Sequence, residues 1–145
     1  MLTVYRASAG AGKTHKLTGE YLNLLFAGAG AYRRILAVTF TNKATDEMKS
    51  RIVEELYNLS SGRKSDYVDS LKSAYSLTEE QVRKQAGKIL TDILHDYSAF
   101  NISTIDRFFQ QTMRAFTREI GLQGGYGIEM DQELVLTSAI DNLLA

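Results

Sequence analysis

The chain has 145 residues, a length typical of one domain, or of one domain with a small subdomain. It contains no cysteine and two histidines, which excludes disulfides, thiol catalysis and cysteine-ligated zinc and leaves little material for a transition-metal site. Lysine and arginine number 17, as do aspartate and glutamate, so a nucleic acid would have to bind at a local surface. The N-terminus matches neither a signal nor a transit peptide, and no apolar run approaches the roughly 18 residues of a membrane span. We therefore expect a soluble, cytoplasmic protein.

The first sixty residues predict two units of strand followed by helix. Residues 2–6 form a short β-prone run, and after a loop of small residues the apolar spacing of residues 17–25 predicts a helix. That helix should stop in the glycine-rich stretch 28–30. Residues 35–40 are a continuous apolar run, as expected for a strand covered on both faces, and residues 43–59 return to helical spacing.

The segment from residue 65 to residue 97 contains no strand candidate and predicts an inserted helical subdomain. Within it, Thr78 and Gln81 fit a capping box, in which the hydroxyl and the amide satisfy each other's backbone N–H groups. One apolar face then continues to Tyr97, which predicts a helix of roughly 19 residues. Residues 100–104 return to strand character.

The last part of the chain predicts two more helices. An apolar stripe over residues 105–116 predicts a helix that ends near Gly121, and residues 133–145 form a last amphipathic helix after a glycine-rich connection. Three alternating strand–helix units favour an open parallel α/β sheet. Because such sheets generally have more than three strands, we expect the missing strands beyond Ala145 in a longer parent protein, or a truncated chain.

Residues 7–14, ASAGAGKT, match a phosphate-binding loop, and they lie between a predicted strand and a predicted helix as that motif requires. Gly10 and Gly12 let the backbone curl around a phosphate, so that N–H groups and the helix N-terminus point at the anion. Lys13 would reach the β and γ phosphates, and the hydroxyl of Thr14 would complete the Mg²⁺ shell. The predicted nucleotide-binding residues are Ala7, Ser8, Ala9, Gly10, Ala11, Gly12, Lys13 and Thr14, with Lys13 and Thr14 as catalytic candidates and Thr14 as the Mg²⁺ ligand.

A plainer interpretation of this loop stays open. Ala7 stands where the strict pattern has glycine, so the segment could be an ordinary turn at a helix N-terminus. His15, which follows the motif, is interpreted as a residue of the helix surface and not as a catalyst. A phosphate loop indicates a nucleoside triphosphate, but many reactions use one. The function must therefore be inferred from the next motif.

A second motif, TFTNKATDEMKSRI over residues 39–52, follows the second predicted strand. Open α/β sheets place their ligand sites at this edge. Hydroxyls, an amide and a helix N-terminus suit a phosphodiester backbone, and Phe40 offers a base about 1–3 kcal/mol of stacking without sequence preference. In the alternative interpretation, Phe40 ends a core strand and Thr41 or Asn42 caps a helix.

These motifs resemble the N-terminal ATP-binding portion of the UvrD/Rep/RecB type of superfamily 1 DNA helicases. Residues 7–14 look like that family's phosphate loop, residues 39–52 are similar to its motif Ia, and ISTIDRFF over residues 102–109 resembles its motif Ib. The RecB and AddA branch of helicase-nucleases, the ATP-dependent exonucleases, is the closer match, because ASAG precedes GKT and the chain starts almost at the first strand. The resemblance extends from residue 1 to about residue 120.

The resemblance implies a fold and an organisation of the chain. It implies a P-loop NTPase (RecA-like) α/β fold, with an incomplete parallel sheet and an inserted helical subdomain. The first part of motor domain 1A would be residues 1–64, and a helical insertion similar to subdomain 1B would be residues 65–98. Residues 99–123 would return to the α/β core, and residues 124–145 would start a further helical segment.

The resemblance also implies ligands. ATP with Mg²⁺ is the implied cofactor, the implied partners are single-stranded DNA or a junction of single and double strands together with a nuclease subunit, and no membrane is involved. Asp106 stands where motif Ib commonly has histidine, and we expect it to cap the following helix instead of contacting phosphate. Arg107, Arg114 and Arg118 share a helix face that either extends the DNA track or is solvated. The implied DNA-binding residues are Thr39, Phe40, Thr41, Asn42, Lys43 and Thr104.

ATP hydrolysis needs a Walker B carboxylate pair and arginines that stabilise the transferred phosphoryl group. The sequence has no apolar strand that ends in Asp-Glu. We therefore expect an N-terminal fragment of an ATP-dependent DNA helicase or translocase of DNA repair and recombination. The parent chain could also carry a nuclease domain further along. The fragment would bind nucleotide weakly and hydrolyse none. A small P-loop phosphotransferase and a non-catalytic nucleotide-sensing module are the alternatives.

Overall fold

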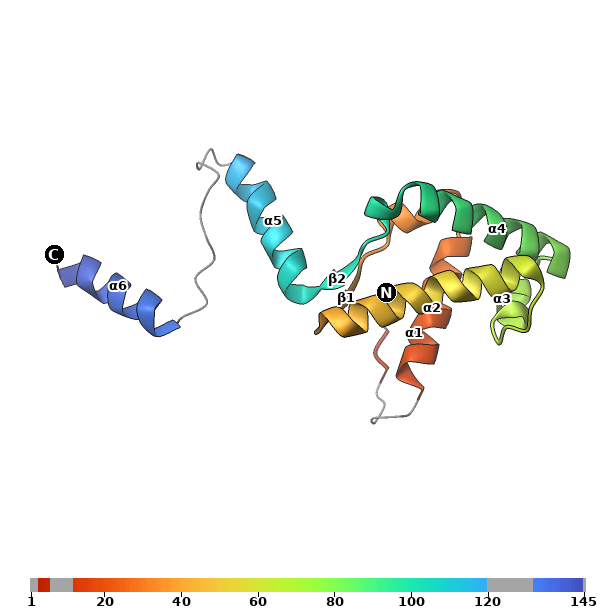
Figure 1. Ribbon diagram of the computed structural model, residues 1–145, viewed down its shortest axis with the longest axis horizontal. Coiled ribbons are helices and arrows are strands. Elements are labelled where there is room, and N and C mark those ends of the chain that lie inside the picture. The colour runs from red at the N-terminus through yellow and green to blue at the C-terminus, as the bar shows by residue number, and fades with distance from the viewer. Residues whose placement is uncertain (1–2, 6–11, 120–131, 145) are drawn as a thin grey trace. The chain divides into compact units, whose positions relative to one another are not determined.

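The computed structural model describes residues 3–5, 12–119 and 132–144 and divides into two compact units, Met1–Phe108 and Phe109–Ala145, each of which is described by itself. None of the described helices has the length and apolar character needed to cross a membrane. The elements, in chain order, are α1 (Lys13–Phe26), η1 (Ala31–Arg34), β1 (Ala37–Thr39), α2 (Asn42–Ser61), α3 (Val68–Tyr75), α4 (Glu79–His95), η2 (Tyr97–Ala99), β2 (Ile102–Thr104), α5 (Ile105–Glu119) and α6 (Gln132–Leu144) (Figure 1).

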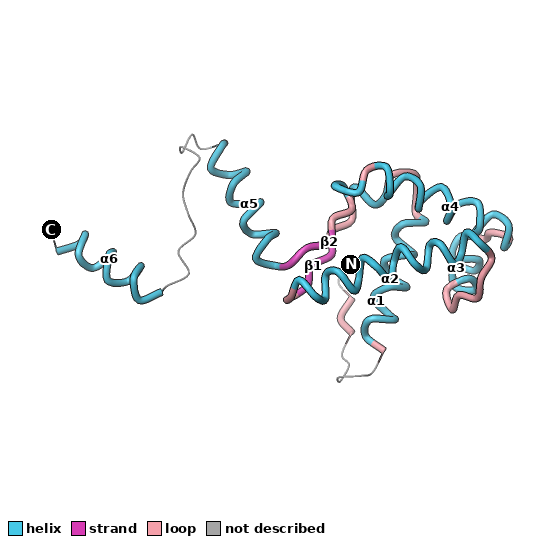
Figure 2. The backbone as a smooth tube through the Cα atoms, in the orientation of Figure 1, coloured by secondary structure: helices cyan, strands magenta, loops and turns pink. Residues whose placement is uncertain are grey.

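The two described strands form a parallel pair. Figure 2 shows the two strands side by side, and in their register Ala37 is opposite Ile102, Val38 is opposite Ser103 and Thr39 is opposite Thr104. Parallel strands require a crossover connection, which here runs through α2, α3 and α4. The predicted strands at residues 35–40 and 100–104 are thus present but short, and both end at one edge of the sheet.

Two strand predictions need correction. The strand predicted at residues 2–6 is absent over its described part, residues 3–5, where the Val4 side chain is 71% exposed and therefore gains little from burial. The strand predicted at residues 35–40 was expected to be covered on both faces, but Leu36 is 50% exposed and Val38 is 46% exposed. In the first unit α2 packs against both strands, so the side chains that alternate to the other face remain open to solvent.

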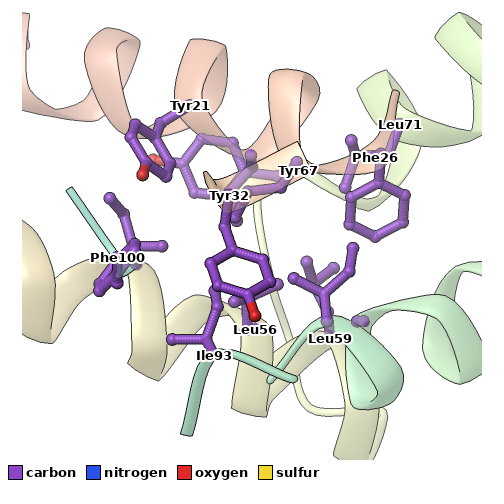
Figure 3. Close-up of a cluster of buried hydrophobic side chains, with 14 of the residues drawn as sticks. Tyr21, Phe26, Tyr32, Leu56, Leu59, Tyr67, Leu71, Ile93 and Phe100 are labelled. Carbon is purple, nitrogen blue, oxygen red and sulfur yellow. The ribbon is translucent and has the colours of Figure 1, made fainter. Parts of the chain in front are cut away.

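Helices α1 to α4 share one hydrophobic core with η1, β2 and Phe100, which lies two residues before β2 (Figure 3). The predicted periodicity identifies the buried faces of α2 and α4, which lie side by side (Figure 1). In α1 the buried face differs from the prediction, because Leu17 and Leu24 are exposed. The main buried side chains are Tyr21, Leu22, Leu25, Phe26, Tyr32, Met48, Ile52, Leu56, Leu59, Tyr67, Leu71, Val82, Ala86, Ile89, Ile93, Phe100 and Ile102.

The predicted ends of α1 and α2 agree with the structure, whereas α4 ends at His95 and not at the predicted Tyr97, which begins η2. Helix α1 ends at Phe26, just before the predicted glycine-rich stop, and Gly62 ends α2 with φ +70°, a left-handed conformation that suits glycine. The capping box at α4 is confirmed. The Gln81 N–H donates to Thr78 Oγ1 over 3.2 Å, and the Thr78 N–H donates to Gln81 Oε1 over 2.8 Å.

Replacing Thr78 with alanine is expected to lower the free energy of unfolding by about 1 kcal/mol, because the Gln81 N–H then loses its acceptor. Urea denaturation followed by circular dichroism measures this change. Thr78→Ser keeps the hydroxyl and should stay close to the wild type. Equal stability of wild type and Thr78→Ala would mean that water caps α4 as well as the threonine does.

The predicted helices at the end of the chain are present as α5 and α6. The predicted end of α5 near Gly121 and the glycine-rich connection at residues 124–127 lie outside the described residues. Phe109, Met113 and Phe116, which belong to the apolar stripe predicted for α5, are exposed. A regular apolar spacing therefore predicted the helix correctly but does not by itself bury its apolar face.

Candidate functional site

The predicted phosphate loop is described from Gly12 onward, and Ala7, Ser8, Ala9, Gly10 and Ala11 lie outside the described residues. Gly12 directly precedes α1 and has φ 72° and ψ 17°. A Cβ at Gly12 would meet no atom within 4 Å, so glycine is favoured there by this left-handed backbone and not by lack of space.

Lys13 and Thr14 are exposed in the first turn of α1, which has 14 residues and no acidic residue in that turn. The positive end of the helix dipole and the free N–H groups of the first turn both favour an anion at this position. An exposed first turn without acidic residues therefore suits phosphate binding. The assignment of Lys13 and Thr14 to ATP phosphates and Mg²⁺ stays a prediction.

The first turns of α1 are held by the residues around them. Thr18 is fully buried, and its hydroxyl donates to the Thr14 carbonyl over 2.8 Å. The side chain of His15 is exposed, as the surface interpretation expected, and its ring stacks on Tyr67 with 4.8 Å between centroids. His15 Nε2 also lies 3.5 Å from a carboxylate oxygen of Asp66.

Residues 3–5 lie beside α1. The Tyr5 hydroxyl donates to Glu20 Oε1 over 3.0 Å, and Lys16 Nζ lies 3.2 Å from the same oxygen and 5.3 Å from the centre of the Tyr5 ring. The hydrogen bonds from Lys16 and Tyr5 lower the pKa of Glu20, which therefore stays ionised at neutral pH. These contacts tie the chain before the predicted loop to the helix after it.

The second candidate surface is the edge at which β1 and β2 end. Thr39 and Thr104 are opposite each other in the parallel register, so the predicted motifs Ia and Ib meet there. The Phe40 side chain is 88% exposed, in contrast to the alternative in which it ends a core strand. Asn42 and Lys43 are also exposed and form the first turn of α2, which contains no acidic residue.

The threonine hydroxyls at this edge bind the protein's own backbone. Thr41 Oγ1 accepts from the Ala44 N–H over 3.1 Å and is the N-cap of α2, as the alternative interpretation proposed. Thr39 Oγ1 lies 2.6 Å from the hydroxyl of Thr45. Both hydroxyls donate to the Thr41 carbonyl, over 3.1 Å and 3.2 Å. This network fixes the two residues on either side of Phe40.

Asp106 does not make the capping hydrogen bond that was expected of it. The Arg107 N–H donates to Thr104 Oγ1 over 3.3 Å, so Thr104 provides the side-chain cap of α5. Strand β2 leads directly into α5, which places Asp106 within the first turn. A carboxylate there is favoured by the helix dipole. Arg107 and Arg114 are exposed, and the side chain of Arg118 lies outside the described residues.

Sequence reasoning did not single out Thr45 or Tyr67. Thr45 lies on the buried face of α2, and its polar side chain in an otherwise apolar helical stripe was the available signal. Tyr67 carried no such signal, since its contacts with α1 join residues far apart in the sequence. Thr45 contacts Thr39 at the strand edge, and Tyr67 contacts His15 at the start of α1.

Comparisons with known proteins identify the family. The UvrD/REP helicase N-terminal domain model matches residues 2–144. Over 114 residues, 79% of the chain, it is 34% identical to RecBCD enzyme subunit RecB of Borreliella burgdorferi. Over 127 residues, 87% of the chain, it is 32% identical to an ATP-dependent helicase/nuclease subunit of Lactobacillus acidophilus. Over 137 residues, 94% of the chain, it is 28% identical to ATP-dependent DNA helicase UvrD1 of Mycobacterium tuberculosis.

The chain spans 9%, 9% and 16% of the lengths of these three relatives. No solved structure gives a significant match. The family model covers nearly the whole chain, and the relatives are helicases of the RecB, AddA and UvrD kinds that the motifs predicted. The chain belongs to the UvrD/REP helicase N-terminal domain family.

Proposed function

We propose that the chain is the N-terminal ATP-binding part of a longer ATP-dependent DNA helicase or translocase. Family membership supports this interpretation over a phosphotransferase or a nucleotide-sensing module. The observation that carries the DNA-binding half is the exposed Phe40 ring, which follows β1 at the edge where α2 and α5 begin. Two relatives are named as subunits, one of the RecBCD enzyme and one of a helicase/nuclease, which supports a parent protein that works with a partner subunit in a complex with nuclease activity.

The proposed nucleotide site is a P-loop over residues 7–14. In it Lys13 holds the β and γ phosphates, and the hydroxyl of Thr14 is a ligand of the Mg²⁺ that ATP brings. The left-handed Gly12, the exposed Lys13 and the absence of acidic residues from the first turn of α1 all fit a bound triphosphate. Within the described residues, no three acidic or histidine side chains are grouped so that they could hold a metal ion. We propose that the 145-residue chain alone does not hydrolyse ATP.

The proposed DNA site is the strand edge. The Phe40 ring stacks on an unpaired base, and the first turn of α2 binds the phosphodiester backbone through N–H groups, with Asn42 and Lys43 beside it. The hydroxyl oxygens of Thr41 and Thr104 already accept hydrogen bonds from the backbone N–H groups that they cap. These threonines, and Thr39, therefore act by shaping the edge. In the proposed organisation residues 1–64 and 99–123 belong to motor domain 1A and residues 65–98 form the 1B-like insertion.

Phe40→Ala is expected to weaken the affinity of the chain for single-stranded DNA by about 5- to 150-fold, the equivalent of one lost stacking contact. Fluorescence anisotropy of a labelled oligothymidylate measures this. Tyr57→Ala is the matched control, because Tyr57 is another exposed aromatic residue but lies near the far end of α2. The DNA half of the proposal fails if Phe40→Ala binds like the wild type, or if both variants weaken binding equally.

A further inference from the structure

Two tyrosines of the α3 region bond to the backbone of α1. The Tyr67 hydroxyl donates to the His15 carbonyl over 3.0 Å, near the start of α1. The Tyr75 hydroxyl donates to the Asn23 carbonyl over 2.6 Å, near its end. The two hydrogen bonds have the same chemistry, but only the first lies next to the proposed phosphate site.

Tyr67 fits closely against the first turns of α1. It is 6% exposed and lies in the core (Figure 3), and its ring stacks on that of His15. Gly19 provides the space for this ring, since a Cβ at Gly19 would lie 3.1 Å from Cε1 and 3.3 Å from Cδ1 of Tyr67. Burial raises the pKa of Tyr67, so its hydroxyl remains a hydrogen-bond donor at neutral pH.

A short series of bonds connects the Tyr67 hydroxyl to the phosphate loop. The His15 carbonyl, which accepts from Tyr67, belongs to the same planar peptide unit as the Lys16 N–H. That N–H donates to the Gly12 carbonyl over 2.9 Å. Gly12 is the residue immediately before Lys13 and Thr14. The Tyr67 hydroxyl is therefore bonded to the peptide unit that directly holds the loop's last glycine.

We propose that Tyr67 is a positioning residue for nucleotide binding, which holds the first turn of α1 so that Lys13 and Thr14 are oriented for the phosphates. This inference rests on the proposed nucleotide site. If Tyr67 orients the first turn of α1, the helical segment that contains α3 affects nucleotide affinity. The effect is reciprocal, because a nucleotide that orders the first turn must equally favour the packing of Tyr67 against α1.

The test compares Tyr67→Phe with Tyr75→Phe in the full 145-residue chain. Each variant removes one hydroxyl that donates to an α1 carbonyl and keeps the aromatic ring. Dissociation constants are measured by calorimetry for Mg²⁺·ATP and for Mg²⁺ with inorganic triphosphate. Tyr67→Phe is expected to weaken both by about 3- to 10-fold, the range for one ordinary hydrogen bond, whereas Tyr75→Phe should leave both nearly unchanged.

Gly19→Ala provides a second variant, which alters neither Tyr67 itself nor any residue of the loop. Its methyl group should push the Tyr67 ring from α1, while alanine favours the helix, so weaker binding cannot come from a melted helix. Equal effects of Tyr67→Phe and Tyr75→Phe, or normal binding by both Tyr67→Phe and Gly19→Ala, overturn the inference alone. Failure of the wild type to bind either probe, or binding insensitive to Lys13→Ala, overturns the proposed nucleotide site and the inference with it.

Discussion

Lys13→Ala in the longer protein is expected to lower DNA-stimulated ATP hydrolysis by about 100- to 1000-fold, the usual loss when one preorganised donor to a reacting group is removed. Lys13 is exposed in the first turn of α1, directly after the left-handed Gly12. In the proposed site its ammonium group neutralises charge on the β and γ phosphates, and alanine cannot replace it. Steady-state phosphate release at saturating single-stranded DNA measures the rate.

Lys16→Ala is the matched control for this prediction. Lys16 belongs to the same helix, but its ammonium group is paired with Glu20 and lies over the Tyr5 ring. Its replacement should leave hydrolysis close to the wild-type rate. Equal losses in both variants would contradict a specific role for Lys13. ATP turnover by the 145-residue chain itself, abolished by Lys13→Ala, would show that this chain contains the hydrolytic residues that we expect elsewhere.

Phe100→Ala is expected to lower the free energy of unfolding by about 3–5 kcal/mol. Phe100 is almost fully buried just before β2, and its ring meets those of Tyr21 and Tyr97 edge-on, with 5.8 Å between centroids in each pair. Removing it leaves a cavity that joins α1, η2 and β2. Since domains of this size are stable by only about 5–15 kcal/mol, the variant should lose much of its stability. Urea denaturation measures the loss.

Phe40→Ala is the control for this loss, because the Phe40 ring is exposed to solvent and the variant should change the free energy of unfolding by less than about 0.5 kcal/mol. The two phenylalanines thus separate stability from binding. A loss below about 1 kcal/mol in Phe100→Ala would contradict tight packing around the start of β2. A large loss in Phe40→Ala would contradict an exposed ring.

The helices were the most predictable part of the fold. Apolar residues at a spacing of three and four identified α2 and α4, and the pair of Thr78 and Gln81 located the start of α4 to the residue. The strands were less predictable, because a continuous apolar run gives no register. The run at residues 35–40 pairs only over Ala37–Thr39, and α2 covers one of its faces, so the predicted burial on both sides was wrong.

For the candidate site, sequence could suggest residue types but not their partners. The motif containing Phe40 was compatible with an exposed ring and with a buried strand end, and the exposed ring in the structure decides between them. The capping roles of Thr41 and Thr104 depend on where each helix begins. The contact between Tyr67 and His15 could not be predicted, because it joins segments that only tertiary packing brings together.

The parallel pairing of β1 with β2 has a consequence for how the protein assembles. A parallel pair cannot form as a local hairpin, so Thr39 and Thr104 can meet only after the whole segment that holds α2, α3 and α4 has been synthesised. During synthesis residues 7–14 leave the ribosome long before Thr104 does. We therefore expect a newly synthesised chain to form the strand edge beside Phe40 late, as the last step of folding in the first unit.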